Sequence, residues 1–158
     1  MVESFPQYSV KELYRGVPKK RKVYNPDGTF VVIEELPNEP IITGIKVFDD
    51  FITELSNGNG KAEKFCEELG VPQVYFSGLI YMLTGLNMSD FKLEYKKCIV
   101  EDYFTYCLPS YNVMDLAAKL GCTSHHLEYL CKKWYNLSAR AARIYFEEKN
   151  DKKNIFIE

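Results

Sequence analysis

Two adjacent histidines, His125 and His126, are the side chains of this sequence best suited to acid–base or metal chemistry. Adjacent side chains on a helix point in different directions, so the two imidazoles do not converge on one ion or substrate. The sequence also contains no glycine-rich phosphate loop, nucleophile elbow or paired-carboxylate motif. We therefore interpret the pair as solvent-facing groups at the start of a helix, and we expect no enzyme, no metal site and no cofactor.

The densest cluster of cations is Lys19-Lys20-Arg21-Lys22, which lies within the hexapeptide PKKRKV. Three interpretations are open: a nuclear-localisation signal, an arm that contacts phosphates, or a charged edge strand kept soluble by its lysines. A strand that leads directly into a hairpin makes a poor flexible signal, so nuclear import is the least favoured of the three.

The histidines belong to a stretch with helix-turn-helix spacing, Val113 to Lys132. Ala117 is the small side chain that two closely crossing helices need at their contact. Gly121 tolerates the positive φ that the sharp turn between the helices requires. The apolar positions that fill the angle between the helices are Leu116, Leu120, Cys122, Leu127 and Leu130.

The same pattern occurs a second time, about 51 residues earlier in the chain, without a gap. Gly70 corresponds to Gly121, and Cys66 corresponds to Ala117. The corresponding apolar positions are Phe65, Leu69, Val71, Phe76 and Leu79. Leu86 corresponds in the same way to Leu137. Two matches in register predict two helix-turn-helix units in tandem.

The composition is that of a folded protein with room for one ordinary domain, or for one domain and a small appendage. The 158 residues are 46% hydrophobic, and no apolar run approaches the roughly 18 residues of a membrane span. The N-terminal segment MVESFPQYSV has neither the basic nor the apolar region of a secretion signal. The five cysteines show no C-x-x-C spacing, which indicates thiols in a reducing cytoplasm.

The N-terminal residues 1–45 are expected to combine a short helix with a β-hairpin. Asn25-Pro26-Asp27-Gly28 is a strong turn signal, and a β-branched, apolar run follows it. The expected elements are a helix over Val10 to Tyr14 capped by Ser9, a hairpin over Arg21 to Glu35 and a short strand over Ile41 to Thr43.

From Lys46 onward apolar residues recur at helical spacing, and glycine, proline or a capping residue separates one run from the next. The first three predicted helices are Lys46 to Leu55, Lys61 to Leu69 and Pro72 to Leu83. A long helix is predicted from Phe91 to about Cys107, capped by Ser89-Asp90 and closed by Pro109. Three more helices follow: the first is opened by Asn112 or Val113, the second is capped by Ser124, and the third runs from Ser138 through Glu147. In the charged tail, Ile155-Phe156-Ile157 is a candidate strand.

Two helix-turn-helix units joined by one long helix and followed by KKWYNLSARAARIYF resemble the DNA-binding domain of the AraC family of bacterial transcription regulators. The resemblance covers residues 46–147, between the N-terminal residues 1–45 and the tail of residues 148–158. In the first unit it is carried by Val71, Tyr75, Phe76, Ser77, Leu79, Thr84, Gly85, Ser89, Asp90 and Phe91. In the second it is carried by Asp115, Leu116, Ala117, Leu120, Gly121, Leu127, Lys132, Lys133, Trp134, Tyr135, Ser138 and Arg143.

The resemblance implies a mainly α-helical regulator that places the second helix of each unit in a major groove of double-stranded DNA. Base-reading side chains come from the exposed start and outer face of that helix. The candidates are Thr123, Ser124, His125, Tyr129, Lys132 and Lys133 in the second unit, and Gln73, Ser77 and Tyr81 in the first. The candidates for phosphate contact are Lys19, Lys20, Arg21, Lys22, Arg140 and Arg143.

Several DNA-facing positions depart from the family pattern. Gly78 stands where the first recognition helix usually has a basic residue, and Tyr81 and Met82 replace the basic pair that follows. Asn136 and Ala139 replace the usual glycine before the last helix and the usual proline in its first turn.

The charge of the chain predicts modest, salt-sensitive affinity for DNA. The formal net charge is −2, whereas DNA-binding domains usually carry a basic excess. Tyr129 stands where the family commonly has an arginine, and Glu128 beside it would repel phosphate unless it reads a cytosine amine.

A second class of function is therefore weighed beside the regulator. The chain can keep the helix-turn-helix fold and act as a protein-interaction module through the apolar face of Val74, Tyr81 and Met82. This hypothesis implies a protein partner or a homodimer, and neither hypothesis involves a membrane. Core positions favour the regulator, and surface chemistry favours the interaction module.

Overall fold

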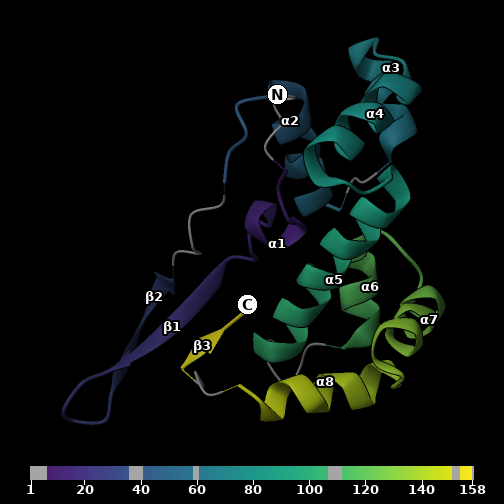
Figure 1. The fold of residues 1–158 in the computed structure, drawn as a ribbon. Helices are drawn as coiled ribbons and strands as arrows, with labels where there is room; N and C mark the ends of the chain where they lie inside the picture. Colours follow the sequence, from purple (N-terminus) through teal and green to yellow (C-terminus); the bar gives the residue numbers. More distant parts are fainter. Residues whose placement is uncertain (1–6, 36–40, 59–60, 107–111, 151–153, 158) are drawn as a thin grey trace. The chain divides into compact units, whose positions relative to one another are not determined.

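The computed structural model describes residues 7–35, 41–58, 61–106, 112–150 and 154–157. Helices predominate, as predicted, and a small antiparallel sheet accompanies them (Figure 1). The helices are α1 (Val10–Leu13), α2 (Lys46–Ser56), α3 (Ala62–Leu69), α4 (Gln73–Thr84), α5 (Met88–Tyr106), α6 (Val113–Leu120), α7 (Ser124–Tyr135) and α8 (Ala139–Glu148). The strands are β1 (Lys19–Tyr24), β2 (Phe30–Glu35) and β3 (Ile155–Phe156). None of the described helices is long and apolar enough to cross a membrane.

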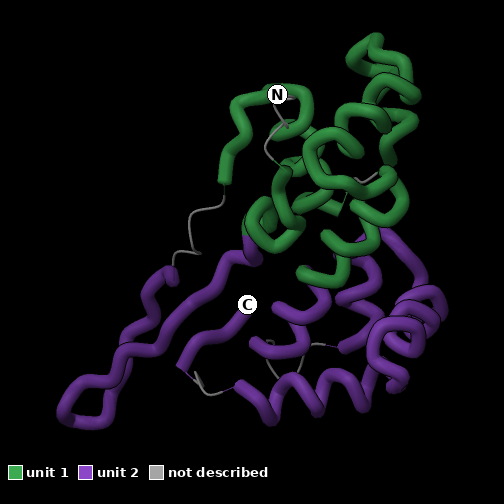
Figure 2. The backbone as a smooth tube through the Cα atoms, viewed as in Figure 1, with its two compact units in different colours: residues 1–15, 39–98 green, residues 16–38, 99–158 purple. Residues whose placement is uncertain are grey.

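The chain forms two compact units, and each of them is built from two separate segments (Figure 2). Unit 1 comprises residues 1–15 and 39–98, and unit 2 comprises residues 16–38 and 99–158. The long helix α5 therefore contributes its first part to unit 1 and its last part to unit 2.

An aromatic cluster fills the core of unit 1. Phe51 of α2 lies edge-on to Phe76 of α4, with their ring centroids 4.9 Å apart. The Phe51 ring also packs against Phe65 of α3 and Phe91 of α5. Burial of each ring contributes roughly 1.5–3 kcal/mol, so this cluster is the main source of cohesion between α2, α3, α4 and α5 in unit 1.

Tyr95 of α5 is also fully buried, and its hydroxyl has partners inside unit 1. It shares a hydrogen bond with the hydroxyl of Ser56 and accepts one from the backbone N–H of Arg15 at 3.4 Å. Burial raises the pKa of the Tyr95 phenol, and the bond with Ser56 opposes that shift in part. The hydroxyl thus ties the end of α2 and the segment after α1 to α5.

Left-handed glycines make the turn of both helix-turn-helix units, as predicted. Gly70 ends α3 with a φ of 68°, and Gly121 ends α6 with a φ of 72°. In each unit the N–H of the next residue donates to a carbonyl inside the preceding helix, that of Cys66 or that of Ala117. The repeat in the sequence is therefore a repeat of backbone geometry as well.

The predicted core of the second helix-turn-helix unit (α6 and α7) is largely confirmed, and that of the first (α3 and α4) needs correction. Leu116, Ala117, Leu120, Leu127 and Leu130 are all buried, whereas Cys122, which was also predicted to fill the angle, is half-buried. In the first unit, Leu69 is 48% exposed, and Ile80 rather than Leu79 is fully buried. Phenylalanine rings fill the angle between α3 and α4, so the aliphatic positions of the repeat are not all needed there.

The N-cap residues are partly as predicted. Ser9, Asn112 and Ser138 cap α1, α6 and α8. Thr123, not Ser124, caps α7, because its hydroxyl accepts from the N–H of His126 at 3.1 Å. Asn87, not Ser89-Asp90, makes the bond at the start of α5, where its side chain accepts from the N–H of Asp90 at 2.8 Å. Cys107 and Pro109, the predicted end of that helix, lie outside the described residues.

The sheet has the strand order β2-β1-β3 and belongs to unit 2. Its hairpin is confirmed, with Lys19 opposite Glu35 and Tyr24 opposite Phe30. The predicted C-terminal strand is confirmed as β3, which pairs antiparallel with the other side of β1. The interpretation of the lysine run as an edge strand is wrong, because β1 lies between β2 and β3.

The short strand predicted over Ile41 to Thr43 does not form. The N–H and the hydroxyl of Thr43 both donate to the carboxylate of Asp49 instead. This segment therefore leads into α2 and does not enter the sheet.

Candidate nucleic-acid interface

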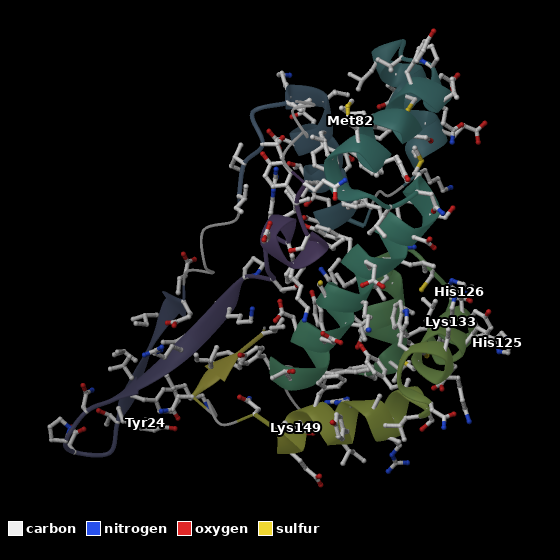
Figure 3. All side chains as sticks on the ribbon, in the orientation of Figure 1. Tyr24, Met82, His125, His126, Lys133 and Lys149 are labelled. Atoms are coloured by element: carbon white, nitrogen blue, oxygen red, sulfur yellow. The ribbon has the colours of Figure 1, made fainter. Side chains whose placement is uncertain are left out.

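The outer face of α7 gathers the side chains that suit DNA recognition. His125, His126, Tyr129, Lys132 and Lys133 are all exposed, and they recur at three- and four-residue spacing along the helix. Figure 3 shows His125, His126 and Lys133 together along α7. The rings of His126 and Tyr129 are stacked with centroids 6.0 Å apart. The face thus combines donors, a phenol and two cations.

The two polar residues at the start of α7 have narrower roles. The Thr123 hydroxyl accepts the capping hydrogen bond from the N–H of His126, although the side chain is exposed. Ser124 is half-buried. Its hydroxyl is consequently less accessible to a ligand than the imidazole of His125.

Glu128 does not lie on this face in the way the sequence suggests. Its carboxylate accepts a hydrogen bond from the backbone N–H of Ala139, the first residue of α8, at 3.0 Å. The negative charge is therefore held at the positive end of the α8 dipole. The expected repulsion of phosphate by Glu128 is reduced, because the side chain is directed to α8.

Helix α8 begins beside α7 and adds two arginines. Arg140 is exposed in its first turn, and Arg143 is half-buried. Asn136, between the two helices, has a φ of 56° and is the only described non-glycine residue with positive φ. Asparagine tolerates this conformation, so it can replace the glycine that the family usually has there.

The outer face of α4 has a different character. The helix contains no charged residue, and Gln73, Ser77 and Tyr81 are the only polar candidates that the sequence analysis placed on it. Gln73 is exposed, Ser77 is half-buried and Tyr81 is 63% exposed. The exposed apolar side chains around them are Val74, Tyr75 and Met82, the last of which is labelled in Figure 3.

Cations that sequence reasoning missed lie next to the start of α4. A surface pocket of about 390 Å³ within unit 1 is lined by Gln73 and by Lys61, Lys64 and Lys92. Burial lowers the pKa of Lys92, and the charge of Lys96 lowers it further. Glu63 and Glu67 also line the pocket and balance much of its charge. Only the packing of α3 and α5 against α4 reveals these lysines, since none of them lies on α4.

The basic strand β1 uses much of its charge inside unit 2. The Lys19 ammonium lies 3.3 Å from the carboxylate of Asp102 and 5.0 Å from the ring centroid of Tyr106. Arg21 pairs with Glu35 at 2.7 Å. The Lys22 ammonium lies over the ring of Phe30. These contacts anchor the hairpin and reduce the charge that it presents to solvent.

The described thiols have no arrangement that suggests chemistry. None of the four described cysteines forms a disulfide, and Cys66 and Cys131 are buried. Burial, followed by the neighbouring Glu128 and Cys122, raises the pKa of Cys131 to about 12. Among the residues that the structure describes, no three His, Cys, Asp or Glu side chains are grouped so that they could hold a metal ion.

Comparison with solved structures identifies the fold. The C-terminal domain of AraT, a response regulator from Geobacillus stearothermophilus, matches with a TM-score of 0.54 and 18% identity, over 63% of this chain and 82% of that chain. The C-terminal domain of the two-component response regulator YesN from Fusobacterium nucleatum matches with a TM-score of 0.53 and 13% identity, over 62% and 94%. No protein-family model and no curated protein matches the sequence. The chain therefore has the fold of the C-terminal domains of AraC-type response regulators, as the resemblance in its sequence predicted.

Proposed function

We propose that this chain is a DNA-binding transcription regulator of AraC-like type that places α7 in the major groove of double-stranded DNA. The observation that carries the proposal is the outer face of α7, which presents Lys132, Lys133 and His125 while the carboxylate of Glu128 is directed to α8. The fold supports the proposal, because this fold exposes the second helix of each unit.

The side chains of the second unit divide into two roles. His125 and Tyr129, with Thr123 and Ser124 at the helix start, are assigned to base edges and to sugar or phosphate oxygens nearby. Lys132 and Lys133 lie further along α7 and are assigned to the phosphate backbone, as is Arg140 at the start of α8. Arg143 is half-buried and plays a smaller part.

The first unit and the hairpin contribute less in this proposal. Gln73, Ser77 and Tyr81 are the polar groups that α4 offers to DNA, and α4 itself has no cation. Lys22, whose ammonium lies over the ring of Phe30, is the member of the basic run retained for phosphate contact. Lys19 and Arg21 have carboxylate partners within unit 2. Affinity is accordingly expected to be modest and strongly dependent on salt.

A salt titration tests the proposal. The full chain is titrated against a labelled duplex of about 30 base pairs, which spans more than two successive major-groove segments, with salt between about 50 and 200 mM. Replacement of both Lys132 and Lys133 by alanine is expected to weaken binding on all sequences and to reduce the salt slope by about 2. The matched control replaces Lys11 and Lys46, exposed lysines outside the proposed interface, and should leave the slope unchanged.

Sequence selection separates the base-reading residues from the phosphate contacts. Duplexes selected from a random pool by the wild type and by His125→Ala or Tyr129→Ala should differ in base preference at one or two positions. Absence of wild-type binding even near 50 mM salt would show that the chain is not a DNA-binding regulator.

The exposed apolar face of α4 favours a second candidate function, a protein-interaction module. Val74 is 74% exposed and Tyr75 is 73% exposed, and no charge interrupts the face between them and Tyr81. Large exposed apolar groups that lie together are typical of protein interfaces. The same titration discriminates the two functions: a module of this kind does not bind the duplex at low salt.

A further inference from the structure

We propose that strand β2 is a dimerisation edge, which pairs antiparallel with β2 of a second copy of this chain about a twofold axis. Among the described residues, β2 pairs with β1 alone, so its other edge offers unpaired N–H and C=O groups. A dimer of this kind continues the sheet from one copy into the other.

The side chains of the hairpin show that this edge is not built for solvent. The six apolar residues Val23, Tyr24, Phe30, Val31, Val32 and Ile33 are each between 38% and 55% exposed. They lie on both faces of the hairpin, since Tyr24, Phe30 and Val32 alternate with the other three. A long apolar edge strand is an aggregation hazard unless something pairs with it.

The distribution of charge in the sheet gives the second argument. Solvent-exposed edges are normally protected by lysines on the edge strand. Here the run Lys19-Lys20-Arg21-Lys22 lies on the central strand β1, and the edge strand β2 begins Phe30-Val31-Val32-Ile33. The first four residues of this edge strand therefore carry no charge, and the charges of β2 are confined to Glu34 and Glu35 at its end.

The sequence of β2 is complementary to itself in antiparallel register. With Val32 on the twofold axis, Val32 faces Val32 of the second copy, and Val31 faces its Ile33. Phe30 then faces Glu34 of the second copy, so that no two glutamates oppose each other. This register places Val31 against Ile33 on one face and Val32 against Val32 on the other, where Phe30 lies against Glu34.

The charges around Phe30 also fit a second copy. The Lys22 ammonium lies 5.0 Å from the centroid of the Phe30 ring and 5.8 Å from that of Phe156, on the face that carries Val32 and Glu34. Glu34 is exposed and lies opposite Lys20 in its own hairpin. In the proposed register Glu34 of the second copy lies opposite Phe30, so it comes to the same face as the ammonium, and the two opposite charges attract across the interface.

Pairing along β2 leaves both faces of the joined sheet open, so it buries the strand backbone and the facing sides of Phe30, Val31, Val32 and Ile33, on the order of 300 Å² per copy. Val23 and Tyr24 lie on β1, one strand away from the axis, and are not counted. An interface of this size is small, so we expect a weak dimer with a dissociation constant of about 10 μM or more.

Sedimentation equilibrium of the full chain without DNA, from about 1 to 200 μM, tests the proposal. The wild type is expected to dimerise, and Val32→Lys to raise the dissociation constant at least tenfold, because two ammonium groups then face each other across the axis. Met114→Lys is the matched control: it adds the same charge at a 70% exposed apolar residue of α6 and should leave the dimer intact. Circular dichroism checks that each variant is folded.

Cysteine cross-linking tests the register. Val32→Cys should form a disulfide-linked dimer, because directly opposed Cα atoms are about 5 Å apart, within the limit for a disulfide. Val23→Cys, on β1, is the control: the two copies of this residue would be about 16 Å apart and should not cross-link beyond the level of the wild type.

A monomeric wild type overturns the proposal, and so does a dimer that Val32→Lys leaves unchanged. Protection of the β2 amides in a monomer would mean that another part of the same chain covers the edge, which also contradicts it. The measurement is independent of the proposed function, because it uses no DNA.

Discussion

The carboxylate of Glu128 on α7 accepts a hydrogen bond at 3.0 Å from the backbone N–H of Ala139, the first residue of α8. Ser138, the residue just before α8, caps the same helix: its hydroxyl accepts a hydrogen bond from the N–H of Ala141 at 3.1 Å. The start of α8 thus has two acceptors from two elements. One of them, the Glu128 carboxylate, is a negative charge on the helix that is proposed to contact DNA.

Glu128→Ala should lower the free energy of unfolding by about 1–2 kcal/mol, because it leaves the N–H of the buried residue Ala139 without its charged acceptor. Glu128→Gln should lose less, since the amide oxygen can still accept while the interaction with the α8 dipole weakens. Urea unfolding measures both. Glu147→Ala, at an exposed position near the other end of α8, is the control, and a loss of equal size there would contradict the role given to Glu128.

Gly78→Lys should strengthen DNA binding if the first unit faces DNA. A Cβ atom added at this exposed position meets no other atom within 4 Å, so a side chain can begin there without a clash. The added cation should increase the salt slope of binding by about 1. Gly78→Ala serves as the uncharged control and should stabilise α4 by roughly 0.5–1 kcal/mol without an effect on the slope. Unchanged affinity of the lysine variant would remove α4 from the interface.

Asn136→Gly should stabilise the chain slightly, and Asn136→Ala should destabilise it by about 1 kcal/mol. The reason is the φ of 56° at this residue, which glycine adopts freely and alanine does not. Thermal unfolding of the two variants measures the difference. Equal melting temperatures would mean that the turn between α7 and α8 does not need the left-handed conformation.

Tyr95→Phe should lower the free energy of unfolding by about 1 kcal/mol at neutral pH, because it removes the hydrogen bond with Ser56. Burial raises the pKa of this phenol, so the folded state holds its proton at a pH where the unfolded chain has released it. The contribution of the phenol to the free energy of unfolding is therefore fully present below about pH 10 and declines as the pH rises further. The difference in stability between wild type and variant, measured by urea unfolding from neutral to alkaline pH, should shrink accordingly.

Most of the fold could be predicted because its signals are local. Gly70 and Gly121 mark their turns by residue type alone, and the spacing of Leu116, Ala117 and Leu120 follows from the geometry of one helix crossing another. The hairpin was equally accessible, because the turn signal at Asn25 to Gly28 is strong. Helix caps were less certain, because threonine, serine and asparagine compete for the same position within two residues.

What could not be predicted depends on tertiary pairing. Whether β1 is a central or an edge strand is decided by Ile155 and Phe156, more than a hundred residues away. The direction of Glu128 depends on where α8 begins in space, and the lysines near Gln73 come from other helices. The sequence therefore identified a candidate face on α7, but it did not reveal where the Glu128 carboxylate lies or which lysines flank Gln73.

The division of each unit into two separate segments limits how this chain can be dissected. The polypeptide passes between the units at residues 15/16, 38/39 and 98/99, and the last of these points lies inside α5. No single break can release either unit as one continuous piece. A gene fusion or recombination event that carries half of this chain would separate β1 from β3 and divide a helix. The two units are therefore expected to be inherited together, as one indivisible module.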